Sequence, residues 1–386
     1  MPWRSLAVIV LTVASLGLLS CSTASALIEP KVRVLLYRGA DPIEVGLVAR
    51  PGEIKLDADG DLVVEGQKKA KRWAPTGPGP WRVGSRIVRG EIVVRSHKKR
   101  IEVLNRVGLE QYVASTVGGE MSPSWPAHAL RAQAVATRTY VLYEANRHRN
   151  QAWDVRATAA SQVYRGLEAE THETLRAARS TVGQILTYEG APILAVFHST
   201  SGGQTATAGE VWGADLPYLR VVEVEDEDDA PHTYWRTAFD RRGLSDVLEA
   251  AGISVGELRT VTIEDRTSSG RVASLVVEGS TGTERIRGRQ LRGLLGGLTL
   301  RSTLFEVRES ADEFVFVGSG HGHGVGMSQW GARAMARQGA SYRRILARFY
   351  PGTRIEILLP RHESLPGLPP RESAAGQEKS QEGDHR

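Results

Sequence analysis

One acidic residue and two basic residues stand out in this sequence because they border or interrupt a long apolar run. Glu120 lies in a turn broken by glycine and proline, shortly before residues 127–145. Alanine, leucine and valine occupy nearly every side of this run, which is typical of a buried helix. At about 100° per residue, Arg131 and Arg138 fall on one face of that helix. Gln133 adds an amide to the same helix.

Charged groups on a buried helix allow two interpretations. An unpaired guanidinium is too costly to keep inside a protein, so Arg131 and Arg138 each need a partner or a ligand. Glu120 beside them is then a candidate for acid–base chemistry. In the alternative, Glu120 belongs to a helix-capping turn and the two arginines form structural ion pairs. The local sequence leaves both interpretations open.

A second set of polar side chains lies in two glycine-rich segments. An apolar stretch, APILAVF, is followed by a histidine and then by a loop of serine, threonine and glycine. A later stretch, GSGHGHGVGMSQW, places two histidines among glycines, where the backbone can approach a ligand closely. The candidate binding residues of these segments are His198, Ser199, Ser201, His323, Ser328 and Gln329.

The chemistry of these residues favours a mechanism with one acid. His198, His321 and His323 would supply three nitrogen ligands to zinc, which leaves a zinc hydrolase as a weaker alternative. The glycines favour backbone contact instead, so we expect no metal and no cofactor. Ser199 and Ser201 lie in a loop and not at a strand-to-helix nucleophile turn, so a Ser/His/Asp arrangement is weaker still. Cleavage of glycosidic bonds usually uses two carboxylates, yet only Glu120 stands out here.

The element pattern predicts an α+β fold. Short β-rich runs separated by turns fill residues 31–104, and a mixed α/β domain with the buried central helix follows. The acidic run 223–229 is expected to be a solvated loop. The expected domains are a β-rich region 27–105 and a domain 106–355 that contains an α+β sub-domain, 221–307. Helices are expected over 108–112, 127–145, 171–181, 243–251, 328–337 and 341–350, a hairpin over 183–199, and strands over 260–265, 272–279 and 284–288.

The composition limits the class of partner. The 386 residues include 49 Lys+Arg and 44 Asp+Glu, which gives a net charge of +5. This scattered excess fits an anionic polymer, but it is too weak and too unpatterned to indicate nucleic-acid binding. A single cysteine, Cys21, excludes internal disulfides and a cysteine-based zinc cluster.

The two ends of the chain differ from the rest. Residues 1–26 combine a basic start with a short apolar core, which is typical of a secretory signal and predicts an exported protein. Cleavage is expected either at the lipobox ending in Cys21, which would then carry a lipid anchor to the membrane, or at an A-x-A site ending in Ala26. The Pro-, Ser- and Glu-rich residues 360–386 are expected to be disordered.

Several ordered blocks carry a resemblance to a known family. They are GGEMSPSWP from Gly118, ALRAQAVA and RTY from Ala129, QVYRG from Gln162, FHSTSGGQT from Phe197, VWG and PYL from Val211, and GHGVGMSQWGA and FYPGT from Gly322. In this order they resemble the SpoIID/LytB family, named for stage II sporulation protein D and an amidase enhancer. The resemblance covers the greater part of the predicted domain 106–355.

The resemblance implies a lytic transglycosylase of peptidoglycan glycan strands, with strands stripped of stem peptides preferred in the sporulation members. The family's catalytic glutamate falls on Glu120. By analogy it protonates the oxygen between N-acetylmuramic acid and N-acetylglucosamine, then deprotonates the sugar's 6-hydroxyl to close a 1,6-anhydro ring. Burial beside the apolar helix should raise the pKa of this acid. A nearby arginine would lower it, so Arg131 and Arg138 are expected to bind substrate or pair elsewhere.

The family also implies a second function and a shared cleft. Its amidase-enhancer members suggest a non-catalytic peptidoglycan-binding protein that stimulates a cell-wall amidase. We expect His198, Ser201, His323 and Gln329 to line one cleft with Glu120. Two departures from the family pattern matter. A serine separates Glu120-Met from the following proline, and arginine replaces a common lysine at Arg131. The zinc site of some sporulation members needs a cysteine that this chain lacks.

Overall fold

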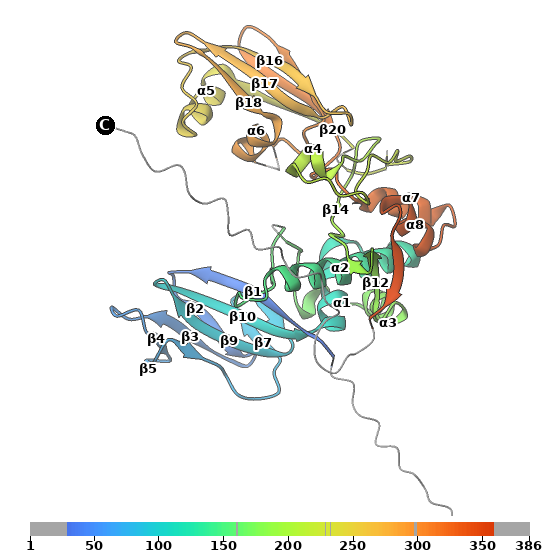
Figure 1. The fold of residues 1–386 in the computed structure, drawn as a ribbon. Coiled ribbons are helices and arrows are strands. Elements are labelled where there is room, and N and C mark those ends of the chain that lie inside the picture. Colours follow the sequence, from blue (N-terminus) through green and yellow to red (C-terminus); the bar gives the residue numbers. More distant parts are fainter. Residues whose placement is uncertain (1–28, 160, 228, 232, 297–298, 359–386) are drawn as a thin grey trace, which may run out of the picture.

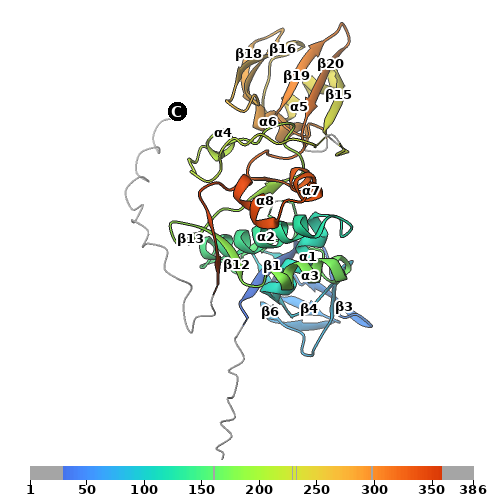
Figure 2. The same ribbon diagram turned by 90° about the vertical axis from the view of Figure 1, so that its right-hand side faces the viewer.

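The structure, a computed structural model, describes residues 29–159, 161–227, 229–231, 233–296 and 299–358. The predicted signal segment, with Cys21 and Ala26, and the predicted tail 360–386 lie outside the described residues. Helices and strands both contribute extensively, so the predicted α+β class is confirmed. In Figures 1 and 2 the described chain forms three tiers: a β-rich tier, a helical tier in the middle, and a second β-rich tier.

The first tier contains two sheets, with strand orders β11-β1-β10-β9-β6 and β5-β4-β3-β2-β7-β8. In β1, Val32, Val34 and Leu36 alternate towards the core, as the two-residue period of a strand requires. The strand-rich character predicted for 31–104 is confirmed. The strands are β1 (Lys31–Gly39), β2 (Ile43–Leu47), β3 (Arg50–Leu56), β4 (Leu62–Val64), β5 (Gln67–Lys69), β6 (Arg72–Trp73), β7 (Trp81–Val83), β8 (Arg86–Val88), β9 (Glu91–His97), β10 (Arg100–Gly108) and β11 (Val155–Arg156).

The middle tier is built around the predicted buried helix, α2 (Ala127–Arg147), which is covered on almost every side and shares one hydrophobic core with the first tier. The prediction for the preceding helix is wrong in length. The helix predicted over 108–112 continues as α1 (Leu109–Glu120), so Glu120 is the last residue of a helix and does not lie in a turn. The remaining helices of this tier are α3 (His172–Ser180), α4 (Ala208–Trp212), α7 (Gln329–Arg337), α8 (Tyr342–Phe349) and the 3-10 helix η1 (Leu167–Ala169).

Two distant loops are joined by a short parallel pair. The hairpin predicted over 183–199 forms only at its turn, between β12 (Gln184–Tyr188) and β13 (Ala191–Pro192). The chain then leaves it, and β14 (Phe197–His198) pairs in parallel with β21 (Met327–Ser328). The other edge of β12 is taken by β22 (Arg354–Ile357). This pairing brings the His198 loop and the glycine-rich segment together.

The second β-rich tier has a hydrophobic core of its own, which includes Trp235, Leu275 and Phe316. Its sheets have the orders β15-β20-β19 and β16-β17-β18. The helix and the strands predicted between residues 243 and 288 are confirmed. The elements are β15 (Tyr234–Asp240), α5 (Arg241–Ala250), β16 (Leu258–Arg266), β17 (Val272–Gly279), β18 (Thr283–Arg287), α6 (Gly288–Leu295), β19 (Phe305–Glu309) and β20 (Glu313–Ser319).

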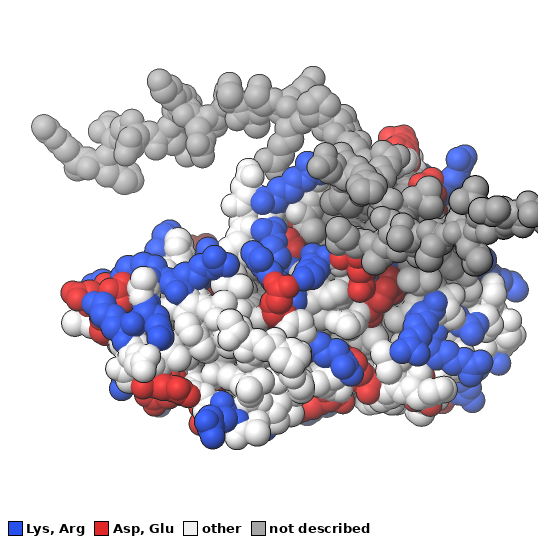
Figure 3. Space-filling model, turned by 90° about the horizontal axis from the view of Figure 1, so that it is seen from below, with Lys and Arg blue, Asp and Glu red and all other residues white. Residues whose placement is uncertain are grey.

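Two further observations concern the surface. Within the described ranges, no helix combines the length and the apolar character needed to cross a membrane. The face in Figure 3 shows Lys and Arg side chains interspersed with Asp and Glu side chains. The excess of basic residues is therefore not gathered into one stripe on the described part of that face.

Candidate active site

Two glycines place Glu120 directly against a neighbouring loop. A side chain on Gly118 would collide with the carbonyl oxygen of Ala169, and one on Gly119 with the carbonyl oxygen of Val163. Glycine is therefore required at both positions, because the loop backbone lies where a Cβ atom would be. The same close approach lets the Val163 N–H donate a hydrogen bond of 2.7 Å to Glu120 Oε1. The sequence Gly-Gly-Glu thus fixes one carboxyl oxygen at the end of α1.

The surroundings of Glu120 favour its neutral form. Its side chain is half-buried, and this burial raises the pKa of the carboxyl group above its ordinary value of 4.5. Hydrogen bonds from Val163 and Gln329 and the positive charge of Arg165 act in the opposite direction, with smaller effects. The predicted raised pKa is confirmed. A carboxylic acid in this environment is suited to donate a proton.

Helix α7 brings a second predicted residue to Glu120. Gln329, at the first position of α7, lies 209 positions later in the chain. Its Nε2 lies 3.4 Å from the carbonyl oxygen of Glu120 and 3.5 Å from Oε2 of the same residue. Because the Val163 N–H occupies Oε1, the other oxygen, Oε2, which lies beside Gln329 Nε2, is the one left to hold a proton.

Two tryptophans and an arginine form a platform beside this pair, which the sequence analysis missed. Trp125 and Trp330 are half-buried and meet edge to face at 4.9 Å between ring centroids. The guanidinium of Arg333 lies over both rings, 5.8 Å and 4.7 Å from their centroids. Trp125 follows Glu120 closely in the chain, and Trp330 directly follows Gln329, so their sequence positions were the available signal. Flat aromatic faces of this kind pack well against the apolar faces of sugar rings.

A buried carboxylate, Glu227, holds the serine loop. It is 4% exposed. It accepts hydrogen bonds from the backbone and Oγ of Ser201, from the Gly202 N–H and from Ser328 Oγ. The prediction that 223–229 is a solvated loop is therefore wrong for Glu227. The run is mostly acidic, and nothing in the sequence marked Glu227 as a carboxylate that turns inward.

Glu227 also accounts for two of the predicted binding residues. Ser201 and Ser328 are fully buried, and both hydroxyls are engaged by this carboxylate. Ser328 caps α7 by accepting the Gly331 N–H at 3.1 Å, and the Ser199 carbonyl accepts the Trp330 N–H at 3.1 Å. Direct substrate binding by Ser201 and Ser328 stays a prediction, and in this structure both hydroxyls are turned to Glu227. They position α7 and hence Gln329.

His198 belongs to β14, and His323 lies in the glycine-rich segment before β21. The rings of His198 and His323 are 5.6 Å apart between centroids. Each uses Nδ1 on the backbone of Val325: His198 contacts the carbonyl oxygen at 3.1 Å, and His323 accepts the N–H at 3.0 Å. Burial lowers the pKa of His198 well below its ordinary range and that of His323 to about 4. Both rings are therefore neutral at physiological pH.

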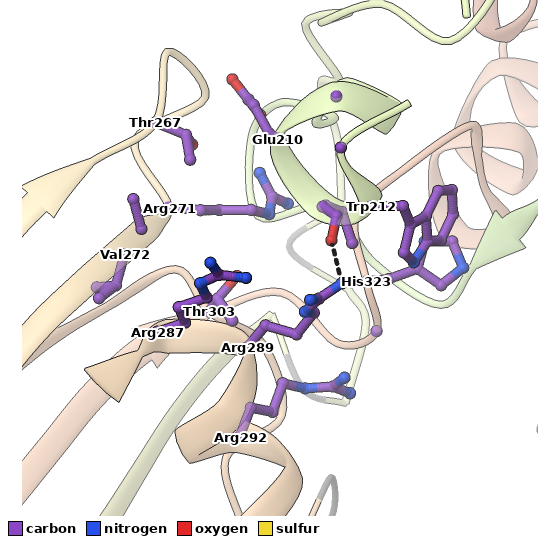
Figure 4. A pocket seen from close by; sticks show the side chains of 15 residues that line it. Glu210, Trp212, Thr267, Arg271, Val272, Arg287, Arg289, Arg292, Thr303 and His323 are labelled. Atoms are coloured by element: carbon purple, nitrogen blue, oxygen red, sulfur yellow. Dashed lines mark hydrogen bonds between the residues drawn. The ribbon is translucent and has the colours of Figure 1, made fainter. Parts of the chain in front are cut away.

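A pocket beside α4 includes His323 but neither Glu120 nor Gln329 (Figure 4). The structure therefore places the predicted residues in two groups, one around Glu120 and one around His323. The two groups are linked through the neighbouring residues Ser328 and Gln329, because Ser328 pairs with His198 across the β14–β21 ladder. Whether one ligand spans both groups stays a prediction.

The three residues of α2 that were predicted to bind substrate contact other parts of the protein. Arg138 is fully buried, and its guanidinium donates to both carboxyl oxygens of Glu110, at 2.8 Å and 2.5 Å, as well as to backbone carbonyls. Of the two alternatives given for Arg138, substrate binding or a structural ion pair, this contact with Glu110 is the ion pair. Arg131 donates to Ser180 Oγ at 3.1 Å. Gln133 is fully buried and donates to Thr137 Oγ1 at 3.2 Å, and a contact of its side chain with substrate stays a prediction.

The described residues offer no ready cluster for a metal. Over the ranges that the structure covers, no three His, Cys, Asp or Glu side chains lie close enough to hold one ion. His198, His321 and His323 come from the same two loops, but Val325 already engages Nδ1 of two of them. The geometry thus gives the zinc-hydrolase alternative no support.

Two family models match this chain. One, described as a stage II sporulation protein, matches residues 97–188, the part that contains α1, α2 and Glu120. The other, described as a domain of unknown function (DUF8618), matches residues 219–326 and covers the second β-rich tier. Neither model alone spans half of the chain.

Curated relatives extend the match over most of the molecule. Stage II sporulation protein D of Bacillus amyloliquefaciens is 33% identical over 269 residues, which is 65% of this chain and 75% of the relative. An uncharacterized protein of Brachyspira hyodysenteriae is 32% identical over 69% of this chain and 71% of its own length. The amidase enhancer of Bacillus subtilis is 30% identical over 61% of this chain. That match spans only 39% of the enhancer's length.

Proposed function

The chain belongs to the SpoIID/LytB family, and on that premise we propose that it is a lytic transglycosylase of peptidoglycan glycan strands. The observation that carries the proposal is Glu120. It is a half-buried carboxylic acid with a raised pKa, with one oxygen engaged by the Val163 N–H and the other facing Gln329. The tryptophan platform of Trp125 and Trp330 beside it suits a sugar polymer.

The proposed reaction uses Glu120 twice. Its Oε2 first gives a proton to the glycosidic oxygen between N-acetylmuramic acid and N-acetylglucosamine, and the bond from that oxygen to C1 breaks. The 6-hydroxyl of the same muramic acid then attacks C1, and the Glu120 carboxylate takes the hydroxyl proton. One bond to C1 is lost and one is formed, so the products are a 1,6-anhydro sugar and a free 4-hydroxyl. Water is not consumed, and a second carboxylate is not needed.

The surrounding residues have supporting roles in this proposal. The Val163 N–H holds Oε1, so the proton stays on the oxygen that faces the substrate. Gln329 lies close enough to Oε2 to stabilise the carboxylate after proton transfer. Trp125 and Trp330, with Arg333 over their rings, would hold sugar units next to the cleaved bond. Peptide-stripped strands are the proposed preferred substrate, as the family resemblance implies.

The test is product analysis. Purified protein is incubated with peptide-stripped glycan strands, and anhydro-muramoyl products are measured by mass spectrometry. Glu120→Gln should lower the rate by about 10²- to 10⁴-fold, because it removes a general acid and base. Glu168→Gln is the matched control, since Glu168 is an exposed carboxylate on the neighbouring 3-10 helix. Absence of anhydro products with wild-type protein would remove the proposal.

A second candidate function is favoured by one comparison. The amidase enhancer of Bacillus subtilis is similar to this chain, so a non-catalytic protein that binds peptidoglycan and stimulates a cell-wall amidase is the alternative. An amidase assay with and without this protein separates the two. Stimulation that Glu120→Gln retains, together with no anhydro products, would favour the enhancer.

The proposed function requires a place at the cell envelope. A lipid anchor at Cys21 is part of the proposal, with cleavage after Ala26 as the alternative. Metabolic labelling with a tagged fatty acid should mark the wild-type protein and not Cys21→Ser. Equal labelling of both, or labelling of neither, would contradict the anchor without touching the catalytic proposal.

A further inference from the structure

A pocket of about 390 Å³ lies where α4 meets the second β-rich tier (Figure 4). Its volume falls in the range of about 300–1,000 Å³ that is usual for small-molecule sites. One wall comes from α4 and the residue after it, with Trp212 as the large side chain. The opposite wall comes from β17, β18 and α6, and His323 closes one side.

Four arginines line this pocket against one carboxylate. Arg271 precedes β17, and Arg287 ends β18. Arg289 and Arg292 lie three positions apart on α6, which puts them on one face of the helix. Figure 4 shows these side chains reaching towards α4 from the opposite wall. Like charges placed this closely repel one another, so their gathering needs a stabilising anion or another compensation.

The lining carboxylate, Glu210, forms no ion pair with these arginines, although its charge and that of Glu227 raise the pKa of Arg271 and so offset part of the effect of its burial. Glu210 accepts hydrogen bonds from the hydroxyls of Ser268 and Ser269, from the Ser269 N–H and from the Thr207 N–H. These bonds cap α4 and tie it to the loop before β17. Within the ranges that the structure describes, the ion pairs of the protein do not include any of the four pocket arginines.

Arg271 is the most informative of the four. It is 2% exposed, and its two Nη atoms donate to the carbonyl oxygens of Gln204 and Ser201, at 3.2 Å and 2.8 Å. Its Nε is buried and has no hydrogen-bond partner among the described atoms. Burial lowers the pKa of Arg271 to about 10, which still leaves the group charged at neutral pH. A side chain on Gly324 would collide with this guanidinium, so the glycine-rich loop makes room for it.

Two of the other arginines, Arg289 and Arg292, donate hydrogen bonds to backbone carbonyls and keep further N–H donors available, while Arg287 is exposed. Arg289 Nη1 donates to the Val211 carbonyl oxygen at 2.8 Å, and Arg292 Nε donates to those of Leu300 and Arg301 at 3.1 Å and 3.2 Å. Each guanidinium has five N–H donors, so most of them stay available. Fixed guanidinium groups are suited to bidentate recognition of carboxylate or phosphate.

The remaining wall suits a sugar ring. Trp212 is 39% exposed, and its ring lies 5.2 Å from that of His323 between centroids. His323 accepts the Val325 N–H through Nδ1, so it is a neutral ring and adds no charge to the pocket. An exposed indole beside a neutral imidazole offers an apolar surface next to the arginines.

We infer that this pocket binds an anionic sugar, whose carboxylate or phosphate oxygens contact Arg271, Arg287, Arg289 and Arg292 and whose ring lies against Trp212. The site shares no lining residue with the Glu120 group and does not require catalysis. Under the proposed function, the natural source of the anion is the free lactyl carboxylate of muramic acid in a peptide-stripped strand. Binding at the pocket would then hold the strand at a second point besides Glu120.

The test measures binding of three small sugars to the full chain by saturation-transfer NMR. N-acetylmuramic acid carries a carboxylate, N-acetylglucosamine 6-phosphate carries a phosphate, and N-acetylglucosamine is neutral. The double variant Arg287→Gln/Arg289→Gln should weaken binding of the anionic sugars by about tenfold or more, because it removes two charge-assisted contacts. Arg259→Gln/Arg308→Gln is the matched control, since it removes two exposed arginines of the same tier that do not line the pocket.

The outcomes distinguish a carboxylate from a phosphate as the bound group, and they test binding at the pocket independently of glycan cleavage. Binding of N-acetylmuramic acid alone supports the carboxylate source, and binding of both anionic sugars supports a general anionic-sugar site. Equal binding of all three sugars, or binding that the pocket variant leaves unchanged, would overturn the inference. Inorganic phosphate that binds as well as either sugar would also overturn it, because the ring then contributes nothing. Glu120→Gln should bind like wild type, so a failed cleavage assay leaves this result intact.

Discussion

Glu227 is the residue whose replacement gives the sharpest test of how the site is held. Its two oxygens accept the Ser201 N–H at 3.0 Å and 3.1 Å, the Ser201 hydroxyl at 2.8 Å, the Gly202 N–H at 2.9 Å and the Ser328 hydroxyl. In Glu227→Gln one acceptor oxygen becomes an NH₂ group. With the amide oxygen at the Oε1 position, the Gly202 N–H faces the NH₂ group and loses its acceptor. With the oxygen at the Oε2 position, the Ser201 and Gly202 N–H groups keep an acceptor and the NH₂ group faces the Ser328 hydroxyl. In both orientations the donors lose the negative charge that they share.

The expected cost follows from these contacts. A hydrogen bond to a charged group contributes about 1.5–3 kcal/mol, and leaving a buried donor unsatisfied costs about 1–3 kcal/mol. The hydroxyls can rotate and recover part of the loss, so the change should lower the free energy of unfolding by about 2–4 kcal/mol. With about 2.1 cal/mol/K of unfolding entropy per residue, a chain of this length loses about 1–1.5 °C per kcal/mol, so Tm should fall by roughly 2–6 °C.

The assay is thermal and urea unfolding of wild type, Glu227→Gln and Glu225→Gln. Glu225 is the matched control, since it is an exposed carboxylate two positions away in the same acidic run. It should change the free energy of unfolding by less than about 0.5 kcal/mol. If Glu227→Gln were as mild as Glu225→Gln, the account of Glu227 as the anchor of the serine loop would be refuted. Because Ser328 caps α7, Glu227→Gln should also lower any activity that depends on Gln329.

Three further outcomes are expected. Gly119→Ala should lower the free energy of unfolding by about 1–3 kcal/mol, because the new Cβ meets a backbone carbonyl. Gly293→Ala, at an open helical position, should leave the free energy of unfolding unchanged or raise it. Urea unfolding compares the two variants, and equal effects would contradict the close approach at Gly119. Arg138→Met should cost about 3–5 kcal/mol by leaving Glu110 unpaired, and adding Glu110→Gln should recover part of that loss in the same assay. The folded-state pKa of Glu120 is raised, so its protonated form, and with it the glycan cleavage rate, should decline as pH rises through a value above 4.5. For the same reason the stability of the wild type falls as pH rises from the ordinary to the raised pKa of Glu120. Glu120→Gln should therefore have a higher Tm than the wild type at pH 7, but not below about pH 4. A Tm of Glu120→Gln equal to or lower than that of the wild type at pH 7 would contradict the burial of the Glu120 side chain.

The most local features of this protein were predictable from the sequence. The apolar residues around α2 identified a buried helix, because burial on all sides removes the polar face that a surface helix needs. The raised pKa of Glu120 also followed from its place beside that helix. The glycines before Glu120 and around His323 indicated close backbone approach, and the collisions at Gly119 and Gly324 bear this out.

Partners distant in the chain were not predictable. Nothing near Arg138 in sequence pointed to Glu110, and the acidic run around Glu227 looked like solvent-facing charge. Helix propensity and hydrophobic period are local quantities, whereas a salt bridge or a buried acceptor is chosen by whichever segment the fold brings alongside. The contacts of Arg138, Ser201 and Ser328 with Glu110 and Glu227 could not be predicted for this reason: residue types indicate what a side chain can do, but not whether another side chain already contacts it.

The sequence by itself thus determined the chemistry available at Glu120: one acid, placed after two glycines, before a helix with no polar face. Only the tertiary structure decided its surroundings. The β14–β21 pair brings residues some 130 positions apart into register, and α7 then places Gln329 and Trp330 beside Glu120 and Trp125. The same packing gathers four arginines in a separate pocket. The local sequence determines which side chains each helix and loop carries. Which of these side chains meet depends on how the tiers pack, because residues far apart in the chain come into contact only through the whole fold.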